Sequence, residues 1–84
     1  MKYCMITFRS VTPAQRAENE IKGMGLFCAL QRTTRRMEEQ GCGYSLRLRA
    51  QDTPRAVAWL RLREIPFRKV YILEENGKME EWQL

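Results

Sequence analysis

The 84-residue chain predicts one α+β domain made of two strand–helix–strand halves. In several short segments, apolar residues alternate with polar ones, which is the period of a half-buried strand. Between these segments, apolar residues recur every three or four positions, which is the period of a helix. Thr12-Pro13 recurs as Thr53-Pro54, and Gly25-Leu26-Phe27 recurs as Ile65-Pro66-Phe67. Two such halves predict a ferredoxin-like split βαβ sandwich (βαββαβ), an antiparallel sheet with both helices on one face.

The first half begins with a strand over Tyr3–Arg9, whose two faces are both largely apolar, as in a central strand. Thr12 suits the N-cap of a helix and Pro13 suits its first position. The glycines that follow this helix end it. A second strand is expected over residues 26–33.

The second half begins with a strand over Tyr44–Ala50, in which Tyr44, Leu46 and Leu48 share the buried face. Thr53-Pro54 repeats the helix start of the first half. Pro66 cannot continue a helix, so the second helix is expected to stop there. The fourth strand follows over residues 68–73.

The C-terminal segment predicts a hairpin. Asn76-Gly77 suits a two-residue type I′ turn, which would place Tyr71 opposite Trp82 and add a short fifth strand. We therefore expect a ferredoxin-like domain over residues 1–73 and an acidic hairpin extension over residues 74–84. A homodimer formed through the C-terminal strand is one hypothesis for this extension.

Composition excludes several kinds of site. The chain has no histidine, which removes the commonest general base and metal ligand. Its three cysteines include no Cys-x-x-Cys pair, so neither a disulfide framework nor a metal site is expected. The net charge is +5, divided between +8 over residues 1–73 and −3 over residues 74–84. With no apolar span and no export signal, we expect a cytoplasmic protein without a membrane partner.

Cys42 is the candidate reactive group. It stands between Gly41 and Gly43 at the mouth of a strand, where glycines leave the backbone free and the thiol uncrowded. Arginines on both sides favour a thiolate, a persulfide or a selenosulfide anion. The alternative is that Cys42 is only a small residue in a glycine-rich turn. Cys4 and Cys28 lie on strands and are expected in the core.

A non-enzymatic binding module is the competing hypothesis, through protein docking, dimerisation or weak RNA binding. RNA-recognition domains share the predicted fold, and Gly41-Cys42-Gly43-Tyr44 resembles their third-strand motif. However, Cys42 stands where a stacking aromatic is needed, and Tyr44 falls on the buried face. Nucleic acid is therefore not the expected partner.

The chain resembles a family of small bacterial domains described as selenium/sulfur carrier-like proteins. The resemblance runs from Tyr3 to Leu73 and includes the opening strand, the pair Cys42-Gly43 and the following Ser45-Leu46-Arg47. The family usually has a proline before the arginine that precedes the loop, here Arg36, and Arg35 stands in its place.

The resemblance implies a carrier rather than an autonomous enzyme, with no cofactor and no metal. Cys42 would accept sulfur or selenium from a donor such as a cysteine desulfurase and pass it to an acceptor protein. The residues expected to shape the loop or stabilise the anion are Gly41, Gly43, Arg35, Arg36, Ser45 and Arg47.

Overall fold

The computed structural model describes residues 2–32 and 43–82. The strands and helices follow the predicted order, with one further strand at the end. The strands are β1 (Tyr3–Phe8), β2 (Cys28–Arg32), β3 (Tyr44–Arg49), β4 (Val70–Leu73) and β5 (Met79–Glu81), and the helices are α1 (Val11–Gly23) and α2 (Thr53–Leu62), with a 3₁₀ turn η1 (Ala50–Asp52) before α2.

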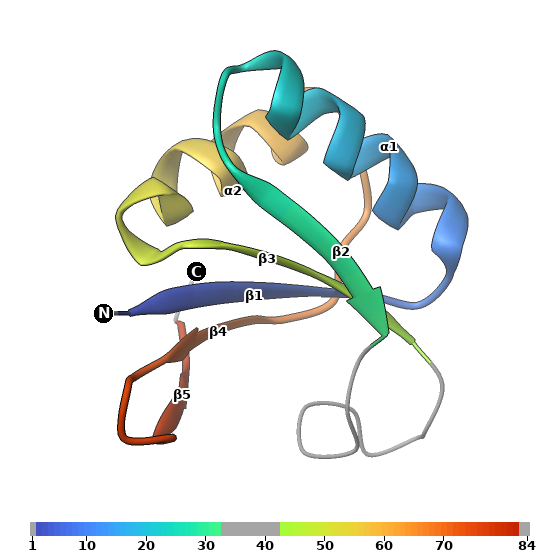
Figure 1. Ribbon diagram of the computed structural model, residues 1–84. Helices are drawn as coiled ribbons and strands as arrows, with labels where there is room; N and C mark the ends of the chain where they lie inside the picture. Colours follow the sequence, from blue (N-terminus) through green and yellow to red (C-terminus); the bar gives the residue numbers. More distant parts are fainter. Residues whose placement is uncertain (1, 33–42, 83–84) are drawn as a thin grey trace.

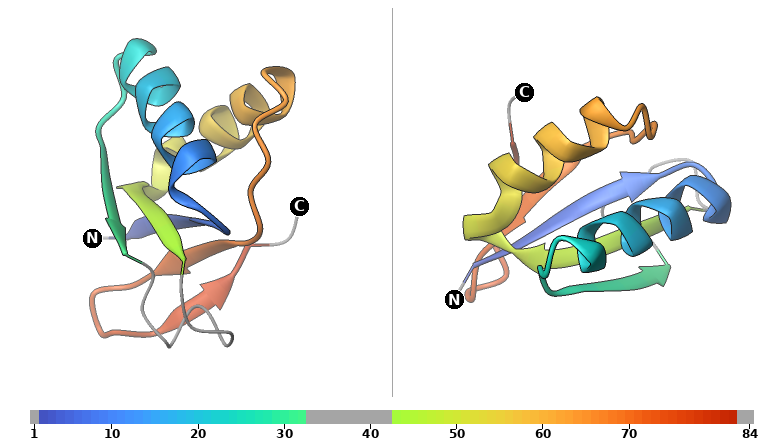
Figure 2. Two further views of the ribbon diagram at one scale, coloured as in Figure 1. Left: turned by 90° about the vertical axis from the view of Figure 1, so that its right-hand side faces the viewer. Right: turned by 90° about the horizontal axis from the view of Figure 1, so that it is seen from above.

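The strands form one antiparallel sheet in the order β2-β3-β1-β4-β5. Both helices cover the same face of this sheet (Figures 1 and 2). The first four strands and two helices therefore form a ferredoxin-like α+β sandwich, and β5 extends the sheet beside β4. The predicted fold class is confirmed, including the additional C-terminal strand.

The hydrophobic core lies between the helices and one face of the sheet. On β1, Cys4 lies opposite Leu48 of β3 and Ile72 of β4, and Ile6 lies opposite Leu46. From the helix side, the core receives three residues of α1 at steps of three and four, namely Ala14, Ala17 and Ile21, and three of α2, namely Ala56, Val57 and Leu60. Tyr44 also packs against this core, as its alternation predicts.

Both helices begin differently from the prediction. The N-cap of α1 is Ser10, so Thr12 lies within the first turn. Thr53 is the first residue of α2, and its Oγ1 donates a hydrogen bond to the carbonyl of Ala50 at 2.7 Å. The 3₁₀ turn before α2 thus occupies the place where a free N-cap residue was expected.

The two helices end in the same backbone motif. In α1, Gly25 and Leu26 donate to the carbonyls of Lys22 and Ile21, and Gly25 has a positive φ of 82°. In α2, Glu64 donates to Arg61 and Ile65 donates to Leu60, and Glu64 has a positive φ of 57°. These are Schellman motifs.

The expected stop at Pro66 is therefore wrong, because α2 already ends at Leu62. In the second half, Glu64 has the positive φ that Gly25 has in the first half. The sequence repeat instead aligns Gly25 with Ile65, one position later.

The β4–β5 hairpin has a longer loop than predicted. Glu74 donates to the carbonyl of Lys78, Gly77 has a positive φ of 85°, and the Asn76 side chain accepts a hydrogen bond from the Lys78 N–H. A loop over residues 75–77, with glycine in the left-handed region, replaces the two-residue type I′ turn.

The change of loop moves the register of β5 by one residue. Tyr71 lies opposite Glu81 rather than Trp82. Since neighbouring residues on a strand face opposite sides, this shift brings Trp82 to the helix side of the sheet. There its side chain packs against the core, and its backbone N–H donates to the carbonyl of Val70 at 2.7 Å.

Candidate functional site

Three of the predicted site residues lie in the described part of the chain, at the start of β3 and along it. Gly43 directly precedes β3 and is buried. Ser45 and Arg47 lie on β3, two residues apart, on the sheet face opposite the helices. The other predicted site residues lie outside the described residues, namely Arg35, Arg36, Gly41 and Cys42.

Ser45 and Arg47 lie in the middle of the sheet, between β1 and β2. Ser45 is opposite Thr7, and Arg47 is opposite Met5. The Ser45 hydroxyl and the Arg47 Nε are buried, and neither has a hydrogen-bond partner among the residues that the structure describes. The Arg47 guanidinium carbon lies 4.9 Å from the centroid of the Tyr3 ring, within range of a cation–π contact.

This burial corrects one expectation from the sequence. Arg47 and Arg49 share a face, and both were expected to be exposed to water. Arg49 is exposed at the end of β3, but Arg47 is only partly exposed, and Ser45 is fully buried. Position in the sheet explains the difference, because Arg47 has neighbouring strands on both sides and Tyr3 against its side chain.

Cys4 and Cys28 are core residues, as expected. Both are buried, with no exposed surface at Cys4 and 5% at Cys28. Burial raises the pKa of the Cys4 thiol to about 11, although a hydrogen bond with Thr53 opposes the shift. Burial also raises the pKa of Cys28, and the carboxylate of Glu18 adds to this effect. Neither thiol is activated as a nucleophile.

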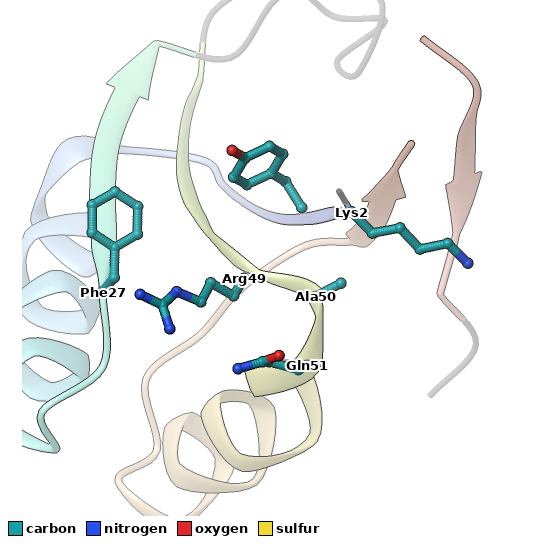
Figure 3. A pocket seen from close by; sticks show the side chains of 6 residues that line it. Lys2, Phe27, Arg49, Ala50 and Gln51 are labelled. Atoms are coloured by element: carbon teal, nitrogen blue, oxygen red, sulfur yellow. The ribbon is translucent and has the colours of Figure 1, made fainter. Parts of the chain in front are cut away.

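A cavity at the far end of β3 is a feature that the sequence did not suggest. It has a volume of about 600 Å³, and its strand residues Tyr3 and Arg49 lie on the sheet face opposite the helices. Its lining residues are Lys2, Tyr3, Phe27, Arg49, Ala50 and Gln51. In Figure 3 the Arg49 side chain extends toward Phe27, whereas that of Lys2 extends the other way. Phe27 and Arg49 come together only because β2 pairs with β3. Alternation along a single strand does not predict which strands pair.

Comparison with known families shows what the chain is related to. The model of a family described as "Putative Se/S carrier protein-like" matches residues 3–72. The chain belongs to this family. The match extends from the start of β1 into β4 and spans the segment that contains Cys42, whereas β5 lies beyond it. Neither the curated proteins nor the solved structures that were compared give a match.

Two absences concern the described residues. Among them, no group of three or more His, Cys, Asp or Glu side chains is placed to hold a metal ion. Within the same residues, no helix has the length and apolar character needed to span a membrane. The described part of the predicted site consists of the buried Gly43, the buried hydroxyl of Ser45 and the guanidinium of Arg47.

Proposed function

We propose that this protein carries sulfur or selenium between partner proteins, as a persulfide or selenosulfide on Cys42. The proposal rests on its membership of the Se/S carrier-like family, whose match spans the segment containing Cys42. The burial of Cys4 and Cys28, which raises both of their pKa values, supports the choice of thiol. We therefore assign the transfer chemistry to Cys42.

In the proposed loading step, the Cys42 thiolate attacks the terminal sulfur of a persulfide on a donor protein, such as a cysteine desulfurase. A new S–S bond forms at Cys42, the S–S bond of the donor breaks, and the electron pair leaves with the donor thiolate. The same displacement at the terminal selenium of a selenosulfide loads selenium. Unloading repeats the step with the acceptor's thiolate as the nucleophile. Neither direction needs an added oxidant or reductant.

We assign Ser45 and Arg47 to stabilising the anion on the loaded cysteine. The support is that the Ser45 hydroxyl and the Arg47 Nε are buried donors without partners among the described residues. A buried donor without a partner costs about 1–3 kcal/mol, and a bound anion would relieve that cost. Arg35 and Arg36 would add positive charge, while Gly41 and Gly43 would leave the thiol uncrowded.

A carrier needs less machinery than an enzyme, and the composition suits it. The whole sequence contains no histidine, so the usual base for activating a thiol is absent. We therefore infer a role in which partner proteins supply the catalysis. In the competing hypothesis, a docking module that does not use its thiol, replacing Cys42 would change nothing.

The proposal is tested by the intact mass of the protein after incubation with a cysteine desulfurase and either cysteine or selenocysteine. A sulfur- or selenium-sized adduct that dithiothreitol removes is expected on the wild type. It should persist in Cys28→Ser, the matched control at a buried thiol, and disappear in Cys42→Ser. An adduct that survives in Cys42→Ser, or no adduct on any variant, would contradict the carrier role.

A further inference from the structure

The cavity at the end of β3 combines an aromatic ring with positive charge. Phe27 is 48% exposed, which is unusual for a large apolar side chain in this protein, since among the described residues only Leu62 is comparably exposed. Arg49 lines the same cavity and is also exposed. Among the described residues that line this first cavity, none carries a carboxylate. A planar ring beside an arginine is the arrangement that holds an aromatic group carrying a negative charge.

Arg49 is the cation available to a ligand. Among the described residues it has no ion pair, whereas the Lys2 Nζ lies 3.3 Å from Glu74 and the Lys22 Nζ lies 3.4 Å from Glu18. Figure 3 shows the Arg49 guanidinium directed toward Phe27 and Lys2 directed away. A ligand that contacts Phe27 can therefore reach Arg49 without breaking an existing ion pair.

A second cavity, of about 410 Å³, shares Phe27 and Arg49 with the first. It is also lined by Lys22 and Asp52. Asp52 offers a carboxylate that can accept a hydrogen bond from a hydroxyl group, and Gln51 in the first cavity offers an amide. The two cavities around the shared Phe27 and Arg49, here together called the hollow, thus offer a ring face, a guanidinium, an amide and a hydroxyl acceptor.

We propose that this hollow binds a mononucleotide, with the base on Phe27, the phosphate at Arg49 and a ribose hydroxyl at Asp52. The volume is in the range of small-molecule sites, and one exposed aromatic ring provides a stacking surface for one base. The hollow lies at the opposite end of β3 from Gly43, about 20 Å away along a six-residue strand. This site does not include Cys42, so a failure of the carrier role would not contradict nucleotide binding, and the reverse also holds.

The test is titration of the full chain with AMP, monitored by amide NMR shifts. Saturable shifts at Phe27, Arg49 and Gln51 are expected. Adenosine lacks the phosphate and ribose 5-phosphate lacks the base, so each should bind about tenfold more weakly than AMP. Equal binding of either fragment, shifts elsewhere, or no saturation at millimolar AMP would overturn the proposal. So would an octanucleotide that binds far more tightly than AMP, because the site would then be one for single-stranded RNA.

Two pairs of variants locate the site. Phe27→Ala should weaken AMP binding about tenfold, whereas Leu62→Ala, at the exposed apolar residue of α2, should leave it unchanged. Arg49→Gln should weaken AMP binding about tenfold more than Arg61→Gln, which removes an exposed arginine of α2. Thermal unfolding confirms that each variant is folded. Equal effects within either pair would contradict the assignment.

Discussion

Cys4 lies on β1 with no exposed surface, and burial raises its thiol pKa from 9.0 to about 11. The unfolded chain exposes the same thiol to water, where it ionises near its ordinary pKa. Folding and the proton on Cys4 are therefore linked. Below about pH 9 both states hold the proton, and the stabilising contribution is fully present. Between pH 9 and 11 only the folded state holds it, so this contribution is lost as the pH rises.

We expect Cys4 to remove about 2–3 kcal/mol of unfolding free energy between pH 9 and 11, since one pKa unit is worth about 1.4 kcal/mol. Urea unfolding at several pH values measures this loss. Cys4→Ala lacks the thiol but keeps every tyrosine and lysine that titrates in the same range. The stability difference between wild type and Cys4→Ala should therefore narrow as the pH rises. Curves that stay parallel would contradict the prediction.

The burial of single residues could be predicted from the sequence where the alternation along a strand determines which face a side chain occupies. Cys4 and Cys28 were expected in the core because each shares a strand face with an apolar residue, Ile6 or Leu30, and both are buried there. The burial of Ser45 was not predicted, because it depends on Thr7 across the strand pair. The position of Cys42 lies outside the described residues, so its reactivity stays a prediction.

At the level of elements, α1 and α2 end in the same backbone motif but place different residues at its left-handed position. Gly25 and Glu64 both occupy the left-handed position of a Schellman motif. Glycine adopts this conformation without cost, whereas a residue with a Cβ is strained by about 1–2 kcal/mol. Glu64 also places a negative charge at the C-terminal end of α2, where the helix dipole disfavours it. The end of α2 is therefore less favourable than that of α1.

Glu64→Gly should raise the free energy of unfolding by about 0.5–1 kcal/mol, because the relief of strain exceeds the added chain entropy. Thermal or urea unfolding measures this gain. Glu64→Ala removes the charge and keeps the strain, so it should gain less. Gly25→Ala should be destabilising although a Cβ there meets no atom within 4 Å, because the backbone conformation alone opposes it. A loss of stability in Glu64→Gly would show that the glutamate side chain has a role of its own.

Element boundaries were harder to predict than element types. The strand and helix periods identified every element of the sandwich, because each has one face against the core. The ends depend on local hydrogen bonds that several residues can make. Ser10, Thr12 and Pro13 are all suitable near a helix start, and the chain uses Ser10 as the N-cap. Asn76-Gly77 fits either a two- or a three-residue loop, and that choice decides which face Trp82 occupies.

At the scale of the whole molecule, the acidic C-terminal segment, residues 74–84, forms ion pairs with the positively charged remainder of the chain. Lys2 pairs with Glu74 at 3.3 Å, and Lys69 pairs with Glu81 at 3.6 Å. These side chains are between 31% and 61% exposed, so each pair contributes little to stability and is screened by salt. The hairpin is held to the sheet chiefly by the β4–β5 hydrogen bonds and by Trp82. Charge complementarity between tail and body is thus not the main reason that β5 extends the sheet.

Trp82 provides the strongest test of this arrangement, because its position follows from the observed register. Its side chain packs against the core and its backbone N–H donates to the carbonyl of Val70, whereas the two-residue turn would have placed it opposite Tyr71 on the other face. Trp82→Ala should lower the free energy of unfolding by about 2 kcal/mol, less than for a fully buried tryptophan. Glu80→Ala, at an exposed neighbour on β5, should change it by less than about 0.5 kcal/mol.

Urea unfolding at low and high salt separates packing from charge. The effect of Trp82→Ala should be the same at both salt concentrations, since burial of the indole is not screened. Hydrogen exchange adds a second measurement, because the Trp82 amide should be protected through its bond to Val70. A wild-type stability that falls steeply with salt, together with a neutral Trp82→Ala, would instead mean that the ion pairs of Glu74 and Glu81 hold the hairpin in place.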